Sequence, residues 1–236
     1  MERVRQAFAM WRWRTDAIMM GALLIILCLA SGSCDRHSNR QSVLTSNEDS
    51  LFKAAAKGDT GEVKRLLDQG ANVETREEEK ETPLMYAAAE GRSDVVNLLL
   101  DRGASINAVS GNGDTALARA VTRSQYETVS LLLNRGAEID KSTDGNGTPL
   151  MAAAAAGDVK MIEMLLKRGA NVNASDDQGY TPLAAAVSRR ASPEVVRLLI
   201  SAGADVNKPN REKETPLMLA QRNGDEAIIS LLSKTP

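Results

Sequence analysis

The chain has 236 residues, with 29 lysines and arginines against 31 aspartates and glutamates, so its formal net charge is −2. Removing residues 1–34 takes away four arginines and two acids, which leaves 25 basic against 29 acidic residues, or −4. This balance argues against a nucleic-acid-binding protein, which would carry a basic face. Aromatic residues make up only 3% of the chain, so aliphatic residues and alanine must form its core.

The first element along the chain has the layout of an export signal. Four arginines precede an apolar run over residues 17–30, and small residues then lead to Cys34. An order of positive, apolar and small residues is typical of such signals, and a run of about 14 residues is short for a membrane span, which needs about 20. We therefore expect residues 1–34 to be an export signal or a lipoprotein signal peptide.

Cys34 follows Ser31, Gly32 and Ser33, an arrangement that resembles the cleavage site of a bacterial lipoprotein, at which the cysteine becomes the lipidated N-terminus. Ser31 departs from that pattern, because the position three residues before the cysteine is usually leucine. Two alternatives stay open, namely ordinary cleavage near Gly32 and an uncleaved signal anchor. The resemblance implies a membrane-anchored lipoprotein on the periplasmic side of the cell envelope, with secretion as the alternative.

Residues 35–48 are polar and aperiodic, which favours a flexible tether. Both cysteines, Cys28 and Cys34, precede it, so disulfides and thiol chemistry are excluded from the rest of the chain. His37 is the only histidine, and neither a phosphate-loop motif nor a cluster of metal-ligating residues follows it. We therefore expect no catalytic residues, no metal and no cofactor, and a protein that is not an enzyme.

From residue 49 onward, a sequence motif recurs every 33 or 34 residues. It consists of Thr-Pro-Leu, an alanine-rich stretch, Leu-Leu and Gly-Ala. The position that begins the motif, called the Thr slot, holds Asp49, Thr82, Thr115, Thr148, Thr181 and Thr215. A fixed period of this length signals a stack of similar supersecondary units. We expect one domain over residues 49–236, with repeats near 49–81, 82–114, 115–147, 148–180, 181–214 and 215–236, the last of which stops early.

The residues of each unit predict two helices and a turn. Threonine is a good N-cap and proline suits the first helical position. Glycines such as Gly91 end the first helix, and apolar residues at helical spacing form the second. Alanine five residues after the Thr slot lets neighbouring helices approach, and the segments 111–114 and 144–147 hold tight-turn residues. No single unit buries a core, so stacking must supply it.

These units resemble ankyrin repeats over residues 49–236. The resemblance implies an all-α solenoid of stacked helix-turn-helix units with β-turn or hairpin loops, and a monomer that binds other proteins. One departure is that the histidine usual in Thr-Pro-Leu-His is absent, which removes a helix-end hydrogen bond from each unit. Its place is taken by Met85, Ala118, Met151, Ala184 and Met218. Polar substitutions in the first and last units, such as Lys53 and Gln221, are typical of caps.

In this family the loops between units and the first helices line a concave face, so the residues that vary there are candidates for binding a partner. Arginine and tyrosine are frequent interface anchors, and we expect four of them to surround a floor of alanines at 152, 155 and 156. The four are Arg123, Tyr180, Arg189 and Arg190. The full set of candidates is Glu78, Glu79, Glu90, Arg123, Tyr180, Arg189, Arg190 and Arg211.

Two segments that carry these candidate residues also have an interpretation without a role in binding. The acidic run over residues 77–81 is either a solvated loop tip or a recognition site for a basic partner. A one-residue insertion between Val187 and Ser192 is either a tolerated lengthening of the turn or a device that presents Arg189 and Arg190.

The sequence therefore predicts an exported, membrane-tethered protein that binds another protein through its concave face without catalysis. One alternative is an inhibitor or immunity-type protein that neutralises a toxin or enzyme in the envelope. Another is a secreted effector that binds host proteins, which a lipidated Cys34 would count against.

Overall fold

The computed structural model describes residues 47–77, 79–141 and 147–234, and Glu48–Pro236 forms one compact unit. The predicted signal segment with Cys34 and nearly all of the predicted tether lie outside the described residues. The same holds for Glu78 and for most of the predicted turn at 144–147.

Pairs of short helices follow one another along the described part of the chain, which contains no strand. The first helices of the pairs cover residues 47–57, α4 (Pro83–Ala89), α6 (Ala116–Thr122), α8 (Pro149–Ala156), α10 (Pro182–Ser188) and α12 (Pro216–Asn223). The second helices are α3 (Thr60–Asp68), α5 (Ser93–Asp101), α7 (Tyr126–Asn134), α9 (Val159–Lys167), α11 (Pro193–Ser201) and α13 (Glu226–Leu232).

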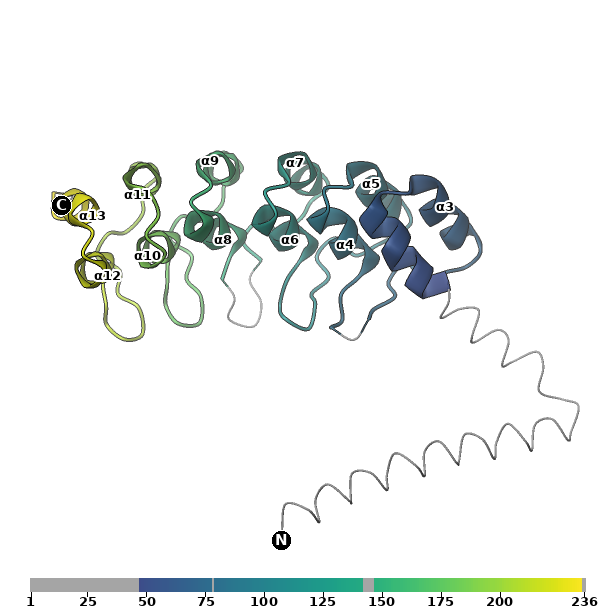
Figure 1. Cartoon of the computed structure of the whole chain (residues 1–236), viewed down its shortest axis with the longest axis horizontal. Helices are drawn as coiled ribbons and strands as arrows, with labels where there is room; N and C mark the ends of the chain where they lie inside the picture. Colours follow the sequence, from purple (N-terminus) through teal and green to yellow (C-terminus); the bar gives the residue numbers. More distant parts are fainter. Residues whose placement is uncertain (1–46, 78, 142–146, 235–236) are drawn as a thin grey trace, which may run out of the picture. The chain divides into compact units, whose positions relative to one another are not determined.

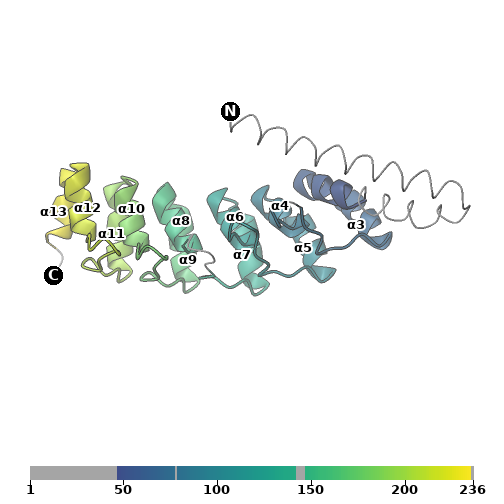
Figure 2. The same ribbon diagram turned by 90° about the horizontal axis from the view of Figure 1, so that it is seen from below.

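The two sets of helices form two rows within this unit, one of first helices and one of second helices (Figure 1). Loops between successive units project from the row of first helices, on the side away from the second helices, and the view from below shows the pairs side by side (Figure 2). This is the all-α solenoid of helix-turn-helix units that the repeat predicts.

Each threonine of the Thr slot caps its helix, as the sequence predicts. Its side chain accepts a hydrogen bond from the backbone N–H three residues later, for example 3.1 Å for Thr115 and 3.2 Å for Thr181. In the fourth unit the N–H of Thr148 also donates to the sulfur of Met151 at 3.4 Å. Sulfur is a weak acceptor, so this contact only partly replaces the bond that a histidine would make there.

The predicted alanine and leucine slots form the core. Ala54, Ala87, Ala120, Ala153, Ala186 and Ala220 are at most 5% exposed. One leucine in each second helix is also buried, as shown by Leu66, Leu99, Leu132, Leu165, Leu199 and Leu232. Burying each such leucine contributes about 1.5–3 kcal/mol, and the neighbouring unit provides much of the cover.

The one-residue insertion is confirmed, and it lies at the start of the second helix of the fifth unit. Helix α5 begins eleven residues after Thr82, whereas α11 begins at Pro193, twelve residues after Thr181. Arg190 occupies the position that Gly91 has in the second unit and adopts a left-handed conformation with φ of 58°. The extra residue therefore follows Arg190, and it leaves Ala191 buried.

Successive loops are tied together by a repeating hydrogen bond. A polar side chain eight residues before the Thr slot accepts the N–H of a residue in the next unit, as when Asn173 accepts from Asp205 at 2.8 Å. The other acceptors of the set are Glu74, Asn107 and Asp140. The bond recurs because the units are stacked in the same register, and it gives the loop side of the stack a continuous polar connection.

The tips of these loops are called fingers below. In the described loops each finger is closed by a backbone hydrogen bond, which joins Lys80 to Glu77, Gly113 to Ser110, Gly179 to Asp176 and Lys213 to Asn210. The predicted turn near Gly111 is thus confirmed, since the N–H of Gly113 donates to the carbonyl of Ser110 at 3.1 Å. Neighbouring fingers touch: the N–H of Gly111 donates to the carbonyl of Glu79 at 2.6 Å.

No helix within the described ranges is long and apolar enough to span a lipid bilayer.

Candidate protein-binding surface

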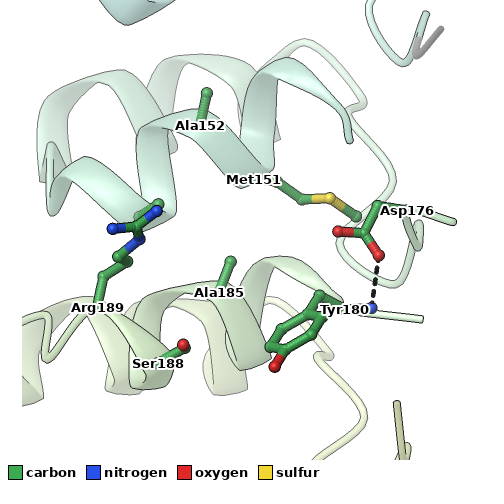
Figure 3. A pocket seen from close by; sticks show the side chains of 8 residues that line it. Met151, Ala152, Asp176, Tyr180, Ala185, Ser188 and Arg189 are labelled. Atoms are coloured by element: carbon green, nitrogen blue, oxygen red, sulfur yellow. Dashed lines mark hydrogen bonds between the residues drawn. The ribbon is translucent and has the colours of Figure 1, made fainter. Parts of the chain in front are cut away.

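The first helices and the fingers together form one face of the solenoid, called the inner face below. A hollow of about 290 Å³ lies on it between α8 and α10 and is called the alanine hollow (Figure 3). Its lining residues are Met151, Ala152, Ala155, Asp176, Tyr180, Ala185, Ser188 and Arg189.

The hollow exists because small residues stand where other units have large ones. Four residues after the Thr slot, the fourth and fifth units have Ala152 and Ala185, which are both half-buried. The second and third units have Tyr86 and Arg119 at this position. Arg119 reaches across to Glu81 and Asp114, whereas the short alanine side chains leave an open apolar floor.

The finger end of the hollow is held by Asp176. Its Oδ1 accepts the backbone N–H of Tyr180 at 2.8 Å, the bond drawn in Figure 3, and that of Gln178 at 2.9 Å. These bonds close the finger and fix where the half-buried Tyr180 ring leaves the backbone. At the opposite end, Arg189 is the residue that ends α10, and Figure 3 shows its side chain directed toward α8.

The structure brings two of the four predicted anchors to the alanine floor. Tyr180 and Arg189 line the hollow, whereas Arg123 and Arg190 are not among its lining residues. Arg123 lies 3.8 Å from Glu90, another candidate, and both side chains are largely exposed, so this ion pair contributes little to stability. Whether any of these residues binds a partner stays a prediction.

Two further candidates, Arg211 and Glu79, each lie on a finger that contacts the adjacent finger. The backbone of Arg211 donates to the carbonyl of Gln178 at 2.8 Å, and its side chain is exposed. The carboxylate of Glu79 accepts from the side chain of Asn112 at 3.1 Å. Glu79 therefore connects two fingers as well as being available at the surface.

Two described residues of the acidic run over 77–81, Glu79 and Glu81, contact other units. Glu81 is only 5% exposed and pairs with Arg119, which also lies 3.5 Å from Asp114. Burial raises the pKa of the Asp114 carboxyl above its ordinary value. These contacts join Arg119 of α6 to residues that directly follow the first two fingers.

A second hollow, of about 280 Å³, lies at the other end of the inner face. It is lined by Asp49, Phe52, Lys53, Ala56, Glu77 and Tyr86. The rings of Phe52 and Tyr86 meet edge to face with centroids 5.5 Å apart, and the Tyr86 hydroxyl donates to Glu77. Burial, followed by this hydrogen bond, raises the pKa of Tyr86 to about 12.

Sequence reasoning missed Phe52 and Tyr86. Their rarity could have marked them as candidates for binding. The described part of the chain has only four aromatic residues, which are Phe52, Tyr86, Tyr126 and Tyr180. Three of them line hollows on the inner face. No group of three or more histidine, cysteine, aspartate or glutamate residues suited to a metal ion occurs in the described ranges.

A row of helix pairs with projecting loops and an open face defines a binding scaffold of the solenoid class. The model of the family described as "Ankyrin repeats (3 copies)" matches residues 16–110, 51–143, 106–176 and 138–210. The chain therefore belongs to the ankyrin repeat family, as the sequence comparison of its units implied.

Solved structures agree with this assignment. A chain from the complex of the predatory endopeptidase Bd0816 of Bdellovibrio bacteriovorus with the immunity protein Bd3460 is 32% identical, with a TM-score of 0.70. The match covers 79% of this chain and 97% of that one. No curated protein matches the chain significantly.

Two ankyrin repeat domains are similar to about the same degree. One, from Acinetobacter baumannii, is 31% identical with a TM-score of 0.68 and covers 78% of this chain and 95% of that chain. The other, from human ASB11, is 29% identical with a TM-score of 0.68 and covers 78% and 81%. Because ankyrin repeats are protein-binding modules, the inner face is the surface on which a protein partner is to be sought.

Proposed function

We propose that this chain is an exported protein, tethered to a membrane through Cys34, that binds a partner protein on its inner face and performs no catalysis. The observation that carries the proposal is the alanine hollow. It is an open apolar floor with Tyr180 and Arg189 at its ends. Buried floors with aromatic and arginine anchors are typical of the centres of protein interfaces.

A second candidate narrows the first and is favoured by one comparison. In it, the chain is an inhibitor or immunity-type protein that neutralises a toxin or enzyme of the cell envelope. Its support is the 32% identity and near-complete coverage of a chain from an endopeptidase–immunity protein complex. On this reading the partner is a hydrolase, and binding by the inner face blocks its activity.

Affinity capture tests the binding function. The fragment 35–236 serves as bait in envelope fractions, and saturable partners are identified by mass spectrometry. Tyr180→Ala and Arg189→Glu should each weaken capture about tenfold or more, because interface anchors contribute well over 1 kcal/mol. Arg197→Glu, on α11 in the row of second helices, is the matched charge change and should have no effect. Equal capture by all four baits would refute the inner face as the binding surface.

The anchoring part has its own test. Cells that express the full chain are labelled with a palmitate analogue, and wild type is compared with Cys34→Ala. Label on the wild type alone supports lipidation at Cys34, and equal labelling of both proteins refutes it. If a captured partner is a hydrolase, its turnover with and without the bait tests the inhibitor reading, and unchanged turnover would exclude it.

A further inference from the structure

We propose that the alanine hollow binds a carboxylate-bearing side chain of the partner protein. Arg189 pairs with the carboxylate, and the alanines of α8 and α10 contact the aliphatic part of the same residue. The inference rests on the proposed function, since it names the chemical group that the inner face recognises.

Arg189 is a cation without a counterion. In the described ranges, neither an ion pair nor a hydrogen bond is found for its guanidinium group. The arginine at the same position of the third unit, Arg123, is paired with Glu90, which stands eight residues after the Thr slot of the preceding unit. In the fourth unit that position is Ala156, so the side chain that would neutralise Arg189 is missing.

The other charge in the hollow is placed away from Arg189. Asp176 lies at the finger end, and Figure 3 shows it on the opposite side of the alanine floor from Arg189. Its Oδ1 already accepts two backbone N–H groups, from Gln178 and Tyr180. A carboxylate that enters at the helix end therefore meets the arginine, and the hydroxyl of Ser188 lies on the same side as a further donor.

The floor selects for an aliphatic stem. Ala152, Ala155 and Ala185 present methyl groups, and Met151 lies at the finger end, where Figure 3 shows its side chain directed toward Asp176. A glutamate side chain carries two methylene groups before its carboxylate, so it can cover the methyl groups while its charge reaches Arg189. Charge-assisted hydrogen bonds of this kind change affinity by about tenfold or more.

Defined peptides test this directly on the full chain in mild detergent. Saturation-transfer difference NMR compares acetyl-Gly-Leu-Glu-Gly-amide with the same peptide carrying glutamine, and with one carrying lysine. We expect saturable binding of the glutamate peptide and at least about tenfold weaker binding of the other two. Circular dichroism melts verify that every variant is folded.

Two variants should abolish the preference for glutamate. Arg189→Gln removes the cation. Ala156→Glu keeps it but supplies the missing internal carboxylate at an exposed position at the end of α8. Glu163→Gln, on α9 in the row of second helices, is the control and should leave peptide binding unchanged. The inference is wrong if the glutamine peptide binds equally well or if Ala156→Glu has no effect. Tighter binding of the lysine peptide, lost in Asp176→Asn, would identify a basic group as the occupant instead.

Failure of this inference is distinguishable from failure of the proposed function. If capture of the envelope partner is lost in Tyr180→Ala but the peptides show no preference for glutamate, only the carboxylate assignment fails. If capture is equal for wild type and Tyr180→Ala, the inner face is not the binding surface, whichever peptide is preferred.

Discussion

Asp158 is the residue at which the polar groups of the third and fourth units meet. Its carboxylate accepts hydrogen bonds from the hydroxyls of Ser124 at 2.7 Å and Tyr126 at 2.9 Å, and from the backbone N–H of Met161 at 3.0 Å. The ammonium of Lys160 lies 4.2 Å from the centre of the Tyr126 ring. A single carboxylate thus caps α9 and joins it to the turn before α7.

These contacts predict a dependence of stability on pH. Burial alone would raise the pKa of Asp158, but the bonds from Met161, Ser124 and Tyr126 outweigh it and hold that pKa below its ordinary value. A lowered pKa in the folded state means that the stabilisation is present above the unfolded pKa, about 4, and is lost as pH falls through the folded value.

Asp158→Asn should therefore reduce the free energy of unfolding by about 1 kcal/mol at pH 7, a modest value because the group is partly solvated. The difference from wild type should shrink as the pH falls from 7 to about 2, because the folded state progressively binds the proton that the unfolded state already holds. Urea unfolding at the two pH values measures it. Asp225→Asn, which removes the charge of the similar cap of α13, is the control and should show a smaller difference. A loss that is independent of pH would contradict the assignment.

Four described residues other than glycine adopt left-handed conformations, and Lys213 is among them with φ of 62°. This conformation costs an L-residue about 1–2 kcal/mol, and glycine avoids that cost while losing about 0.5–1 kcal/mol in entropy. Lys213→Gly should therefore raise the free energy of unfolding by about 0.5–1 kcal/mol, measured by thermal and urea unfolding. Glu212→Gly in the same turn should not stabilise the protein, and stabilisation by both would show that the backbone conformation is not the cause.

At the scale of elements, the fingers pack through their backbones. Gly111 has an ordinary negative φ, yet a Cβ there would lie 2.9 Å from the carbonyl oxygen of Glu79. The glycine is required because the two fingers approach closely, and a side chain would push them apart together with their hydrogen bond.

Gly111→Ala should lower the free energy of unfolding by about 1–2 kcal/mol, because the contact is with backbone and cannot move aside cheaply. Gly61→Ala is the matched control: Gly61 lies within α3, a Cβ there meets only the Asp59 side chain at 3.6 Å, and alanine favours the helix by about 0.5–1 kcal/mol. The two changes should thus have opposite signs in urea unfolding, and stabilisation by Gly111→Ala would refute the close approach.

Much of the element level could be predicted because it depends on local chemistry. The capping threonines, the proline at the first helical position and the alanine slot each act within one unit, and all were found in place. The contacts between units were not predictable in the same way. The pairing of Glu81 with Arg119 joins residues that no motif connects, and it depends on the distance between stacked units.

At the scale of the whole molecule, the last described unit exposes a residue that earlier units bury. Three units carry methionine three residues after the Thr slot, and the side chains are 1% exposed at Met85, 5% at Met151 and 51% at Met218. The same residue type in the same local structure is buried or exposed according to whether another described unit follows it.

Met85→Gln should lower the free energy of unfolding by about 2–3 kcal/mol, because a buried amide replaces a buried thioether. Met218→Gln should change it by less than about 0.5 kcal/mol, as is usual for exposed positions. Thermal unfolding of both variants measures the difference. Comparable losses would mean that something covers the end of the stack.

The sequence by itself determined the repeat, its period, the helix pairs and the family, because these depend on slots that recur at a fixed spacing. Only the tertiary structure decided which varied residues meet. Tyr180 and Arg189 share a hollow, Arg123 is engaged by Glu90, and Arg190 lies elsewhere. The reason is geometric: whether a side chain on the inner face is free depends on the residue at the same position one unit away, and that distance is set by packing.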